Sequence, residues 1–276
     1  IPFSTIRFPN GNNSWSLNMF RRIRRYRADY SWNFIDISYE NHRAQSGLLE
    51  FESFNIDPPL RLSFMPYVAA YADMYDGETS FPYNYGMDLK YGINERFTLD
   101  MTLIPDFGQV AADDKVLNLS PFEIRYEEKR QFFTEGTELF GKGQEMFYTR
   151  RVQDDLLNAS KISGRNQKGL GIGVLNAITN QTDDEPLTNY NVMIVNQAFG
   201  NNSSISLMNT HMLQKGSGKD ANVTGLITQI NNKENTHSYQ ANLKMSQEFE
   251  GNEITRGYGG QLALNKTSGN YKYELE

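Results

Sequence analysis

Four carboxylates between residues 127 and 138 are the side chains best spaced for acid–base chemistry. They are Glu127, Glu128, Glu135 and Glu138. A glycosidase needs two carboxyl groups about 5–10 Å apart, one to donate a proton and one to act as nucleophile or base. Glu135 and Glu138 are the candidate pair for that role. The neighbouring Lys129 and Arg130 favour the alternative, in which the carboxylates form ion pairs that stabilise a folded segment.

Two other groups of side chains could bind a ligand. An arginine-rich stretch could hold phosphate or an acidic glycan through bidentate contacts, and it comprises Arg21, Arg22, Arg24, Arg25 and Arg27. The favoured alternative is a solvated strand surface, because charge runs are usually exposed. Trp15 and Trp32 could stack on sugar rings, although single tryptophans in β domains more often pack in a core or an interface.

The composition argues against several classes of function. A formal charge of −6 and a pI near 5.3 speak against a nucleic-acid partner, whose binding domain would be basic. The chain has no cysteine, which removes disulfides, thiolate metal ligands and cysteine nucleophiles. The histidines His42, His211 and His237 lack metal-ligand spacing, and no nucleotide-binding motif is present. We therefore expect no metal and no cofactor.

The elements that must position these groups are long β-strands. Apolar and polar residues alternate in residues 239–248, and the pattern recurs in residues 83–94 and 97–103. Strands of a soluble sandwich usually have about five or six residues, whereas a tilted membrane-spanning strand needs about 9–11. The chain has no run of 18 apolar residues, which a membrane-spanning helix would need. The pattern predicts an all-β fold, an antiparallel transmembrane β-barrel.

The same alternation assigns side chains to the two faces of the barrel wall. Charged strand residues should face the lumen, because an Arg or Lys facing lipid would cost about 2–4 kcal/mol near the membrane midplane. The expected lumen-facing residues are Asp88, Lys90, Asp100, Lys244 and Glu248. Gly169, Gly171 and Gly173 share one face of another strand, and their missing side chains predict that a second segment approaches closely there.

From residue 168 onward, strands are separated by connections of two lengths. The strands are expected near residues 168–180, 188–199, 203–213, 221–231, 236–248, 254–265 and 270–276. The short connections are 200–202, 232–236 and 266–270, and the longer polar ones are 181–188, 214–220 and 250–255. Bacterial outer-membrane barrels have short periplasmic turns and longer outer loops. The chain would therefore enter its first long strand, near residues 60–74, from the periplasm.

The chain divides into three predicted parts. Residues 1–35, with strand-like stretches at 1–8 and 15–27, should be the end of a preceding β-sandwich domain. Residues 36–59 form a linker that ends at two prolines, which cannot donate ladder hydrogen bonds. Residues 60–276 should form the N-terminal part of the barrel. Because alternation continues to the last residues, we expect a piece of a longer protein.

Residues 105–155, called the insertion from here on, break the strand rhythm. This segment is too long for a simple loop and should fold inward as a plug or outward as an extracellular cap. Its charged residues suit a polar lumen, and they include Arg125, Glu127, Glu128, Lys129 and Arg130.

Specific short motifs occur along the first 180 residues. They are IPFSTIRFP at 1–9, FRRIRR at 20–25, YSWN at 30–33, PPLRLSFMPYV at 58–68, IPDFGQV at 104–110, EKRQFFTEG at 128–136, ELF at 138–140 and FYTRR at 147–151. In these motifs the chain resembles Bacteroidota outer-membrane proteins in which a carbohydrate-binding family 9-like domain precedes a large β-barrel domain of unknown function. The resemblance implies that residues 1–35 are the periplasmic end of the carbohydrate-binding-like domain, in a Gram-negative bacterium. It implies no reaction.

Three functions are compatible with these patterns. The first is a non-enzymatic, glycan-associated channel, receptor or scaffold in contact with outer-membrane lipid, where the glycan comes from the resemblance alone. The second is a cell-surface polysaccharide hydrolase that uses Glu135 and Glu138. The third is a structural subunit of a larger complex with other outer-membrane proteins. Loss of glycan cleavage on amidation of the two carboxylates would select the second, and a stable co-purifying complex would select the third.

Overall fold

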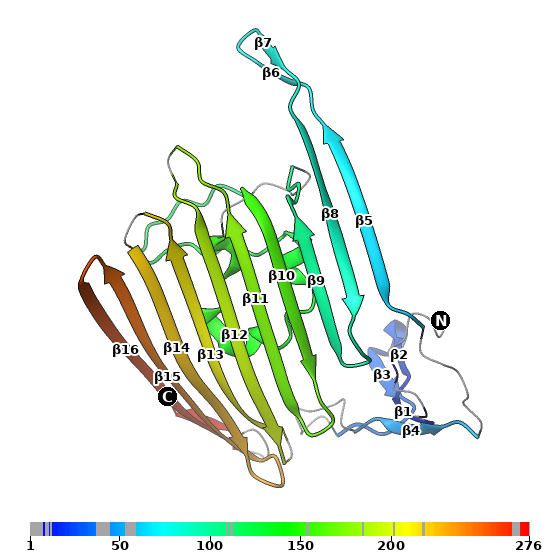
Figure 1. Ribbon diagram of the computed structural model, residues 1–276. Coiled ribbons are helices and arrows are strands. Elements are labelled where there is room, and N and C mark those ends of the chain that lie inside the picture. Colours follow the sequence, from blue (N-terminus) through cyan, green and yellow to red (C-terminus); the bar gives the residue numbers. More distant parts are fainter. Residues whose placement is uncertain are drawn as a thin grey trace.

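The main element of the computed structural model is an antiparallel sheet of 11 strands in the order β17-β16-β15-β14-β13-β12-β11-β10-β9-β8-β5 (Figure 1). The described residues are 8, 11, 13–36, 45–52, 59–108, 110, 113–152, 155–183, 185–200, 202–216, 219–266 and 271–275. Within them the sheet has two edges, β5 and β17, and no closed barrel is found. The all-β prediction is confirmed at the level of a large antiparallel sheet.

Each strand of this sheet pairs with strands near it in sequence. The bounds are β5 (Leu62–Ala70), β8 (Tyr83–Gly92), β9 (Phe97–Leu103), β10 (Leu156–Arg165), β11 (Leu170–Thr179), β12 (Thr188–Phe199), β13 (Ser203–Gln214), β14 (Lys219–Asn231), β15 (His237–Glu250), β16 (Glu253–Lys266) and β17 (Tyr273–Leu275). The alternation predicts these strands except β10, which falls where no strand is expected. A bulge between Leu156 and Asn158 breaks the two-residue period at the start of that strand.

Two connections are shorter than expected. The predicted long loop at 250–255 is wrong, because Glu250 pairs with Glu253 and Gly251 reverses the chain with a φ of +59°. Similarly, β13 and β14 are joined by residues 215–218 alone. The predicted tight turn at 266–270 lies almost entirely outside the described residues.

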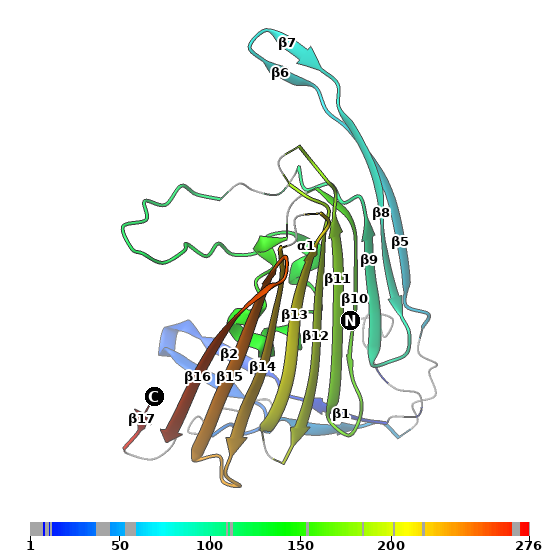
Figure 2. The same cartoon turned by 60° about the vertical axis from the view of Figure 1, so that its left-hand side comes forward.

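The first long strand ends earlier than predicted. After β5, the chain forms a hairpin of β6 (Asp73–Tyr75) and β7 (Glu78–Ser80) before it returns as β8. Asp76 and Gly77 take φ values of +49° and +83°, as a two-residue type I′ turn requires. The Asp-Gly dipeptide therefore reverses the chain between β6 and β7, whereas β5 ends at Ala70, before the predicted end at residue 74. The ribbon made by β5 and β8 rises beyond the other strands and carries this hairpin at its tip (Figure 2).

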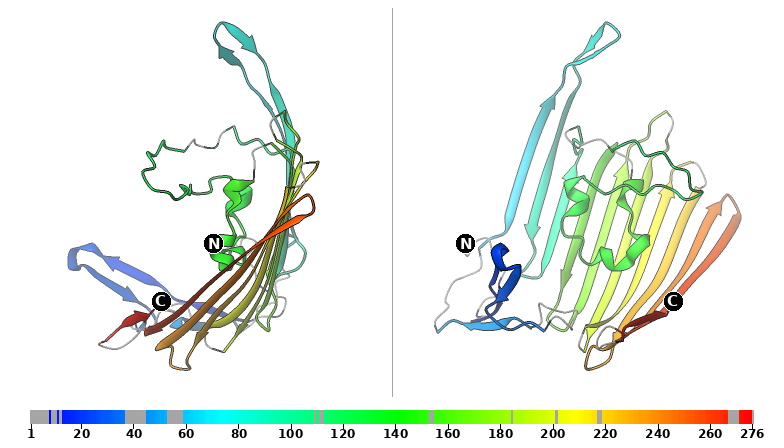
Figure 3. Two further views of the ribbon diagram at one scale, coloured as in Figure 1. Left: turned by 90° about the vertical axis from the view of Figure 1, so that its left-hand side faces the viewer. Right: turned by 180° about the vertical axis from the view of Figure 1, so that it is seen from behind.

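The sheet is curved, and its two faces differ in chemistry. The insertion lies against the concave face (Figure 3), which is mixed: the polar Thr102, Lys161 and Asn196 and the apolar Leu175, Ile194 and Met208 are all buried there. The convex face carries large apolar side chains that are exposed. Among them are Phe64, Tyr85, Met193, Leu207, Leu226, Leu243, Tyr258 and Leu262. A soluble sheet usually keeps its water-exposed face polar, so the apolar convex face is the unusual feature.

A row of hydrogen-bonded asparagines borders the apolar convex surface at the end of the sheet where the insertion joins. We call Asn176, Asn189, Asn191, Asn209 and Asn222 the amide row. The Asn176 Nδ2 donates to the Oδ1 atoms of Asn189 and Asn191 at 2.6 and 2.9 Å. The Asn209 Nδ2 donates to the Asn222 Oδ1 at 2.8 Å. The amide row therefore interrupts the apolar surface with polar side chains on this side, and Leu213 is again exposed beyond it.

The insertion connects β9 to β10 and has short helical turns. These are α1 (Gln131–Thr134), η4 (Phe140–Met146) and η5 (Thr149–Arg151). They lie on the sheet, whereas residues 113–127 run out from it and back (Figure 3). Of the helices in the described residues, none is long and apolar enough to cross a membrane.

The N-terminal part forms two small sheets at the end of the large sheet opposite the β6–β7 hairpin (Figure 1). In one, β1 (Ser14–Leu17) pairs with β4 (Gly47–Glu50); in the other, β2 (Phe20–Ile23) pairs with β3 (Ala28–Ser31), with η2 (Arg24–Tyr26) between them. The strand expected at residues 1–8 lies outside the described residues apart from Phe8. Strand β4 falls within residues 36–59, where only a linker is expected.

Candidate functional site at the insertion

The insertion is held to the concave face by apolar contacts over a strip of glycines. Leu139 and Phe140 are buried together with Leu175, Ile194 and other wall residues. A Cβ added at Gly171 would lie 2.6 Å from the Leu139 Cδ2, and one at Gly173 would lie 3.0 Å from the Phe140 Cζ. The prediction that these glycines admit a second segment is therefore confirmed at Gly171 and Gly173, where that segment is the insertion, whereas at Gly169 the nearest atoms belong to Ala198 of β12.

A side chain in this strip should push the insertion off the sheet. We expect Gly171→Val to destabilise the docked insertion by about 1–3 kcal/mol, because overpacking forces neighbouring side chains out of their rotamers. Limited proteolysis should then cut within residues 131–151 faster than in the parent protein. The matched control is Gly259→Val, on the concave face of β16, where an added Cβ meets nothing within 4 Å. Equal cleavage rates in both variants would contradict this account of the docking.

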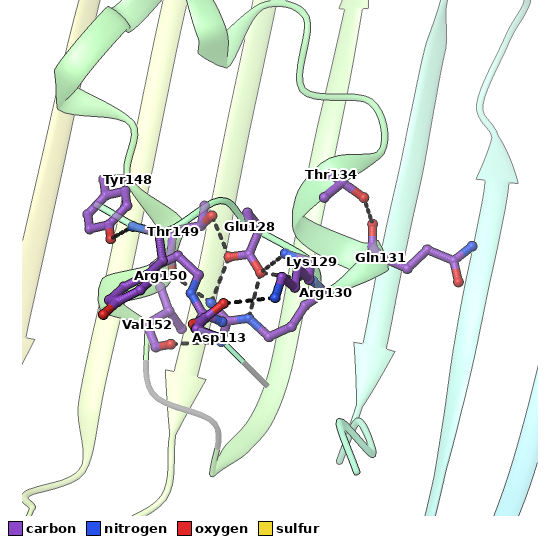
Figure 4. A network of polar contacts seen from close by, with 11 residues as sticks. Asp113, Glu128, Lys129, Arg130, Gln131, Thr134, Tyr148, Thr149, Arg150 and Val152 are labelled. Atoms are coloured by element: carbon purple, nitrogen blue, oxygen red, sulfur yellow. Dashed lines mark hydrogen bonds and ion pairs between the residues drawn. The ribbon is translucent and has the colours of Figure 1, made fainter. Parts of the chain in front are cut away.

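Arg130 is the structural centre of the insertion, and its side chain is almost fully buried (Figure 4). Its Nε and Nη2 donate to the two carboxylate oxygens of Glu128 at 2.9 and 2.8 Å. The Nη1 donates to the Val152 carbonyl at 2.8 Å and the Nη2 to the Thr149 carbonyl at 2.7 Å. The guanidinium carbon lies 4.6 Å from the centre of the Phe133 ring. One side chain thus joins the start of the insertion's folded part to its end.

Glu128 is held in the ionised form by this network. Burial alone would raise the pKa of Glu128, but hydrogen bonds from Arg130 and Thr149 outweigh burial and lower the pKa below its usual value. A second ionic group lies beside it, in which Asp113 pairs with Lys129 at 3.0 Å and also with Arg150 (Figure 4). The predicted ion-paired segment is therefore present, with Asp113 and Arg150 as members that the sequence did not single out.

A further ionic cluster connects the insertion to the wall strands. The Lys90 Nζ lies 2.6 Å from Glu135 in the insertion and 3.5 Å from Asp100 on β9. The buried Lys161 on β10 donates from its Nζ to the carbonyl oxygens of Phe132 and Glu135 at 2.6 and 2.5 Å. Four charged side chains, from β8, β9, β10 and the insertion, therefore lie close together. Lys161 was missed because its strand was not predicted.

The carboxylates of the insertion make its docking sensitive to acid. Hydrogen bonding to Lys90 lowers the pKa of Glu135, and the pKa of Glu128 is also lowered from an ordinary value of 4.5. A lowered folded-state pKa adds stability that is complete above the ordinary value and is lost as pH falls through the lowered one. We expect protease protection of residues 131–151 to persist at pH 6 and to fall as the solution becomes more acidic than about pH 4.5.

Two amidated variants test this acid sensitivity. Glu128→Gln should reduce the pH dependence of protection, because one of the two titrating carboxylates is gone while Glu135 is kept. Glu138→Gln should leave the profile unchanged, because Glu138 is exposed and outside these clusters. A profile that is identical in both variants would show that other groups control docking.

A family model described as a domain of unknown function (DUF5916) matches residues 58–155 and residues 153–276. The chain belongs to the DUF5916 family. No curated protein and no solved structure gives a significant match. The predicted membership of a family of unknown function is confirmed, while Bacteroidota origin, membrane location and carbohydrate-binding character stay predictions.

The two parts of the DUF5916 match meet at a structural boundary. The first part runs from just before β5 to the end of the insertion, and the second begins where β10 is about to start. The insertion and the wall strands on which it docks therefore both belong to the DUF5916 region. The N-terminal small sheets lie before it.

The DUF5916 sheet places the charged strand residues on its concave face. Lys90 pairs in register with Asp100, and Asp88 with Thr102 on the same face. Lys244 and Glu248 lie on this face of β15, opposite Gly225 and Ala221. The Lys244 Nζ lies 3.5 Å from Glu145 of the insertion. The five side chains thus share the face that the insertion occupies, and three of them contact neighbouring charges.

The residues proposed for glycan contact lie ahead of the DUF5916 region. Trp15 packs against Phe8 and Phe51, with ring centres 5.7 and 5.1 Å apart. Trp32 is 58% exposed. In the arginine stretch, Arg22 pairs with Asp29 at 2.7 Å on an open surface. The structure does not bring these aromatic and basic side chains to one pocket.

The candidate catalytic carboxylates have different surroundings in the DUF5916 structure. Glu135 is bound to Lys90 and accepts a hydrogen bond from the Gln131 Nε2 at 2.7 Å. Glu138 and Glu127 are exposed. Arg125 lies over the Tyr148 ring at 5.3 Å. Within the described residues, no group of three or more His, Asp or Glu side chains is arranged to hold a metal ion.

Proposed function

We propose that this protein forms the wall of an outer-membrane β-barrel whose lumen is filled by the insertion, and that it acts as a non-enzymatic channel, receptor or scaffold. One observation carries the proposal: the exposed convex face is apolar, while the buried polar strand residues lie with apolar ones on the concave face that the insertion covers. Met193, Leu207 and Leu243 are each more than half exposed. Monomeric soluble proteins rarely expose contiguous apolar surfaces larger than a few hundred Å².

The dimensions of the strands support a lipid-facing wall. Strands β11 to β16 have 10 to 14 residues, and a tilted membrane-spanning strand needs about 9–11. The amide row would lie at the edge of the hydrocarbon layer, where hydrogen-bonded amides can approach water and lipid headgroups. The long insertion and the β6–β7 hairpin leave the sheet at this same end, which would be the outer side because outer loops are the longer ones.

A filled lumen favours binding or scaffolding over open diffusion. The insertion covers the concave face with a folded, ion-paired core, and this supports a plug in place of an external cap. Outer-membrane lipid is then the partner of the convex face. A glycan or another outer-membrane protein would bind at exposed surfaces. For a hydrolase, one carboxyl group should have a raised pKa, whereas hydrogen bonding to Lys90 lowers the pKa of Glu135; this alternative stays a prediction.

Fractionation of the full-length protein tests the proposal. We expect it in the outer-membrane pool, extractable by mild detergent, with a folded form that runs differently on gels before and after boiling. Recovery in the soluble pool without detergent, with no heat-dependent shift, would overturn the proposal. Single-channel recording would then separate a closed receptor or scaffold from a channel.

A further inference from the structure

A groove of about 660 Å³ lies between the end of the insertion and the concave face. The insertion contributes Met146, Phe147 and Tyr148, and the wall contributes Tyr190 and Met212 among others. Ligand pockets for small molecules usually measure about 300–1,000 Å³ and have mostly apolar and aromatic walls with a few polar groups. The groove has both properties, and it shares Thr149 and Val152 with the network around Arg130.

The charged residues that line this groove are mostly cations. Arg125, Arg151 and Lys244 line it together with the single carboxylate Glu145. The protein as a whole has a net charge of −6, so the groove has the opposite sign. Arg151 pairs with Glu123, and Lys244 lies 3.5 Å from Glu145.

Arg125 differs from the other two cations. Its guanidinium carbon lies 5.3 Å from the centre of the Tyr148 ring, and no carboxylate of the described residues forms an ion pair with it. A guanidinium placed on an aromatic ring keeps its N–H edge available for a bidentate contact with an anion. The groove therefore has an apolar aromatic wall and a positioned, uncompensated cation at its side.

We propose that this groove binds an anionic small molecule with an apolar ring body, such as an aromatic carboxylate. The ring would lie against Phe147, Tyr190 and Met212, and the carboxylate would accept hydrogen bonds from Arg125. Lys244 lies on the wall side of the same groove and adds positive potential. This site depends on the docked insertion and does not depend on whether the convex face contacts lipid.

Photolabelling with benzophenone-4-carboxylate tests the site. The probe combines an aromatic body with a carboxylate, and its excited carbonyl inserts into nearby C–H bonds. We expect peptide mass spectrometry of the full-length protein to find the label at Met146 or Met212. Arg125→Gln should weaken saturable labelling by about tenfold, as expected for one lost hydrogen bond to a charged group. Lys244→Gln, which lies on a different element, should also weaken it.

Three comparisons make the result decisive. Arg256→Gln is the matched control, because Arg256 is exposed on the convex face of β16 and does not line the groove; labelling should be unchanged. Uncharged benzophenone should label the groove less than the carboxylate does. Equal labelling by both probes, equal labelling of Met193 on the convex face, or full labelling of the Arg125 variant would overturn the proposal. None of these outcomes depends on the membrane fractionation above, so the two proposals can fail separately.

Discussion

The substitution Leu207→Arg is expected to prevent stable insertion of the sheet into a bilayer. Leu207 lies on the convex face of β13, beside Val195 and Leu226 on the neighbouring strands, and is 53% exposed. If this face contacts lipid, Leu207→Arg should cost about 2–4 kcal/mol, because a cation near the membrane midplane loses its hydration. On a water-exposed surface the same change would alter stability by about 0.5 kcal/mol or less. Urea unfolding in lipid vesicles, followed by heat-modifiable gel mobility, measures the difference.

The matched control is His211→Arg on the same face of the same strand. His211 pairs with Asn191 and Asn222 of the amide row, about 13 Å along the strand from Leu207. If the amide row lies at the membrane edge, arginine there should cost about 0–1 kcal/mol. Equal and small effects at both positions would contradict a lipid-facing convex surface.

Removal of the Arg130 side chain is expected to undock the insertion. Arg130→Met leaves Glu128 partly buried without its cation and leaves the carbonyl groups of Thr149 and Val152 without their donor. Loss of one member of a buried ion pair costs about 3–5 kcal/mol. Amide hydrogen exchange at Phe133 and Val152, whose N–H groups are bonded within the insertion, should accelerate accordingly, while exchange in β12 and β13 should change little.

Two further variants separate the buried pair from general loss of charge. Lys129→Met removes a partly exposed partner of Asp113 and should cost about 0–1 kcal/mol. The double variant Arg130→Met with Glu128→Leu should be more stable than Arg130→Met alone, because the unpaired carboxylate is removed as well. A double variant as unstable as the sum of the two single changes would show that the pair is not coupled.

The strands could be predicted because successive residues of a strand alternate between the two faces of the sheet, whose surroundings differ in polarity. Over β15, the apolar Tyr239, Leu243 and Met245 alternate with Gln240, Lys244 and Ser246, and the register with β14 and β16 keeps this order. The close approach at Gly171 and Gly173 was also predictable, since glycine on one strand face leaves space that another segment must fill.

Other features depend on contacts that the local pattern does not contain. Strand β10 has Ala159, Lys161 and Ser163 on its concave face and an early bulge, so its alternation is weak. The ion pairing of Arg130 and Glu128 was predicted, but their partners Thr149 and Val152 lie about 20 residues away in the chain and were not. The groove beside Arg125 combines one insertion with several strands, and therefore no single stretch of sequence indicates it.

The attachment of the insertion has a mechanical consequence. Strands β9 and β10 are hydrogen-bonded neighbours, with Leu103 opposite Asn158, so the insertion leaves the sheet and returns to it at adjacent points. The insertion could therefore move away from the concave face while all hydrogen bonds between the strands of the sheet are kept. The contacts between the insertion and the side chains of the concave face would oppose that motion. The sheet would keep its shape while the space on its concave side opens.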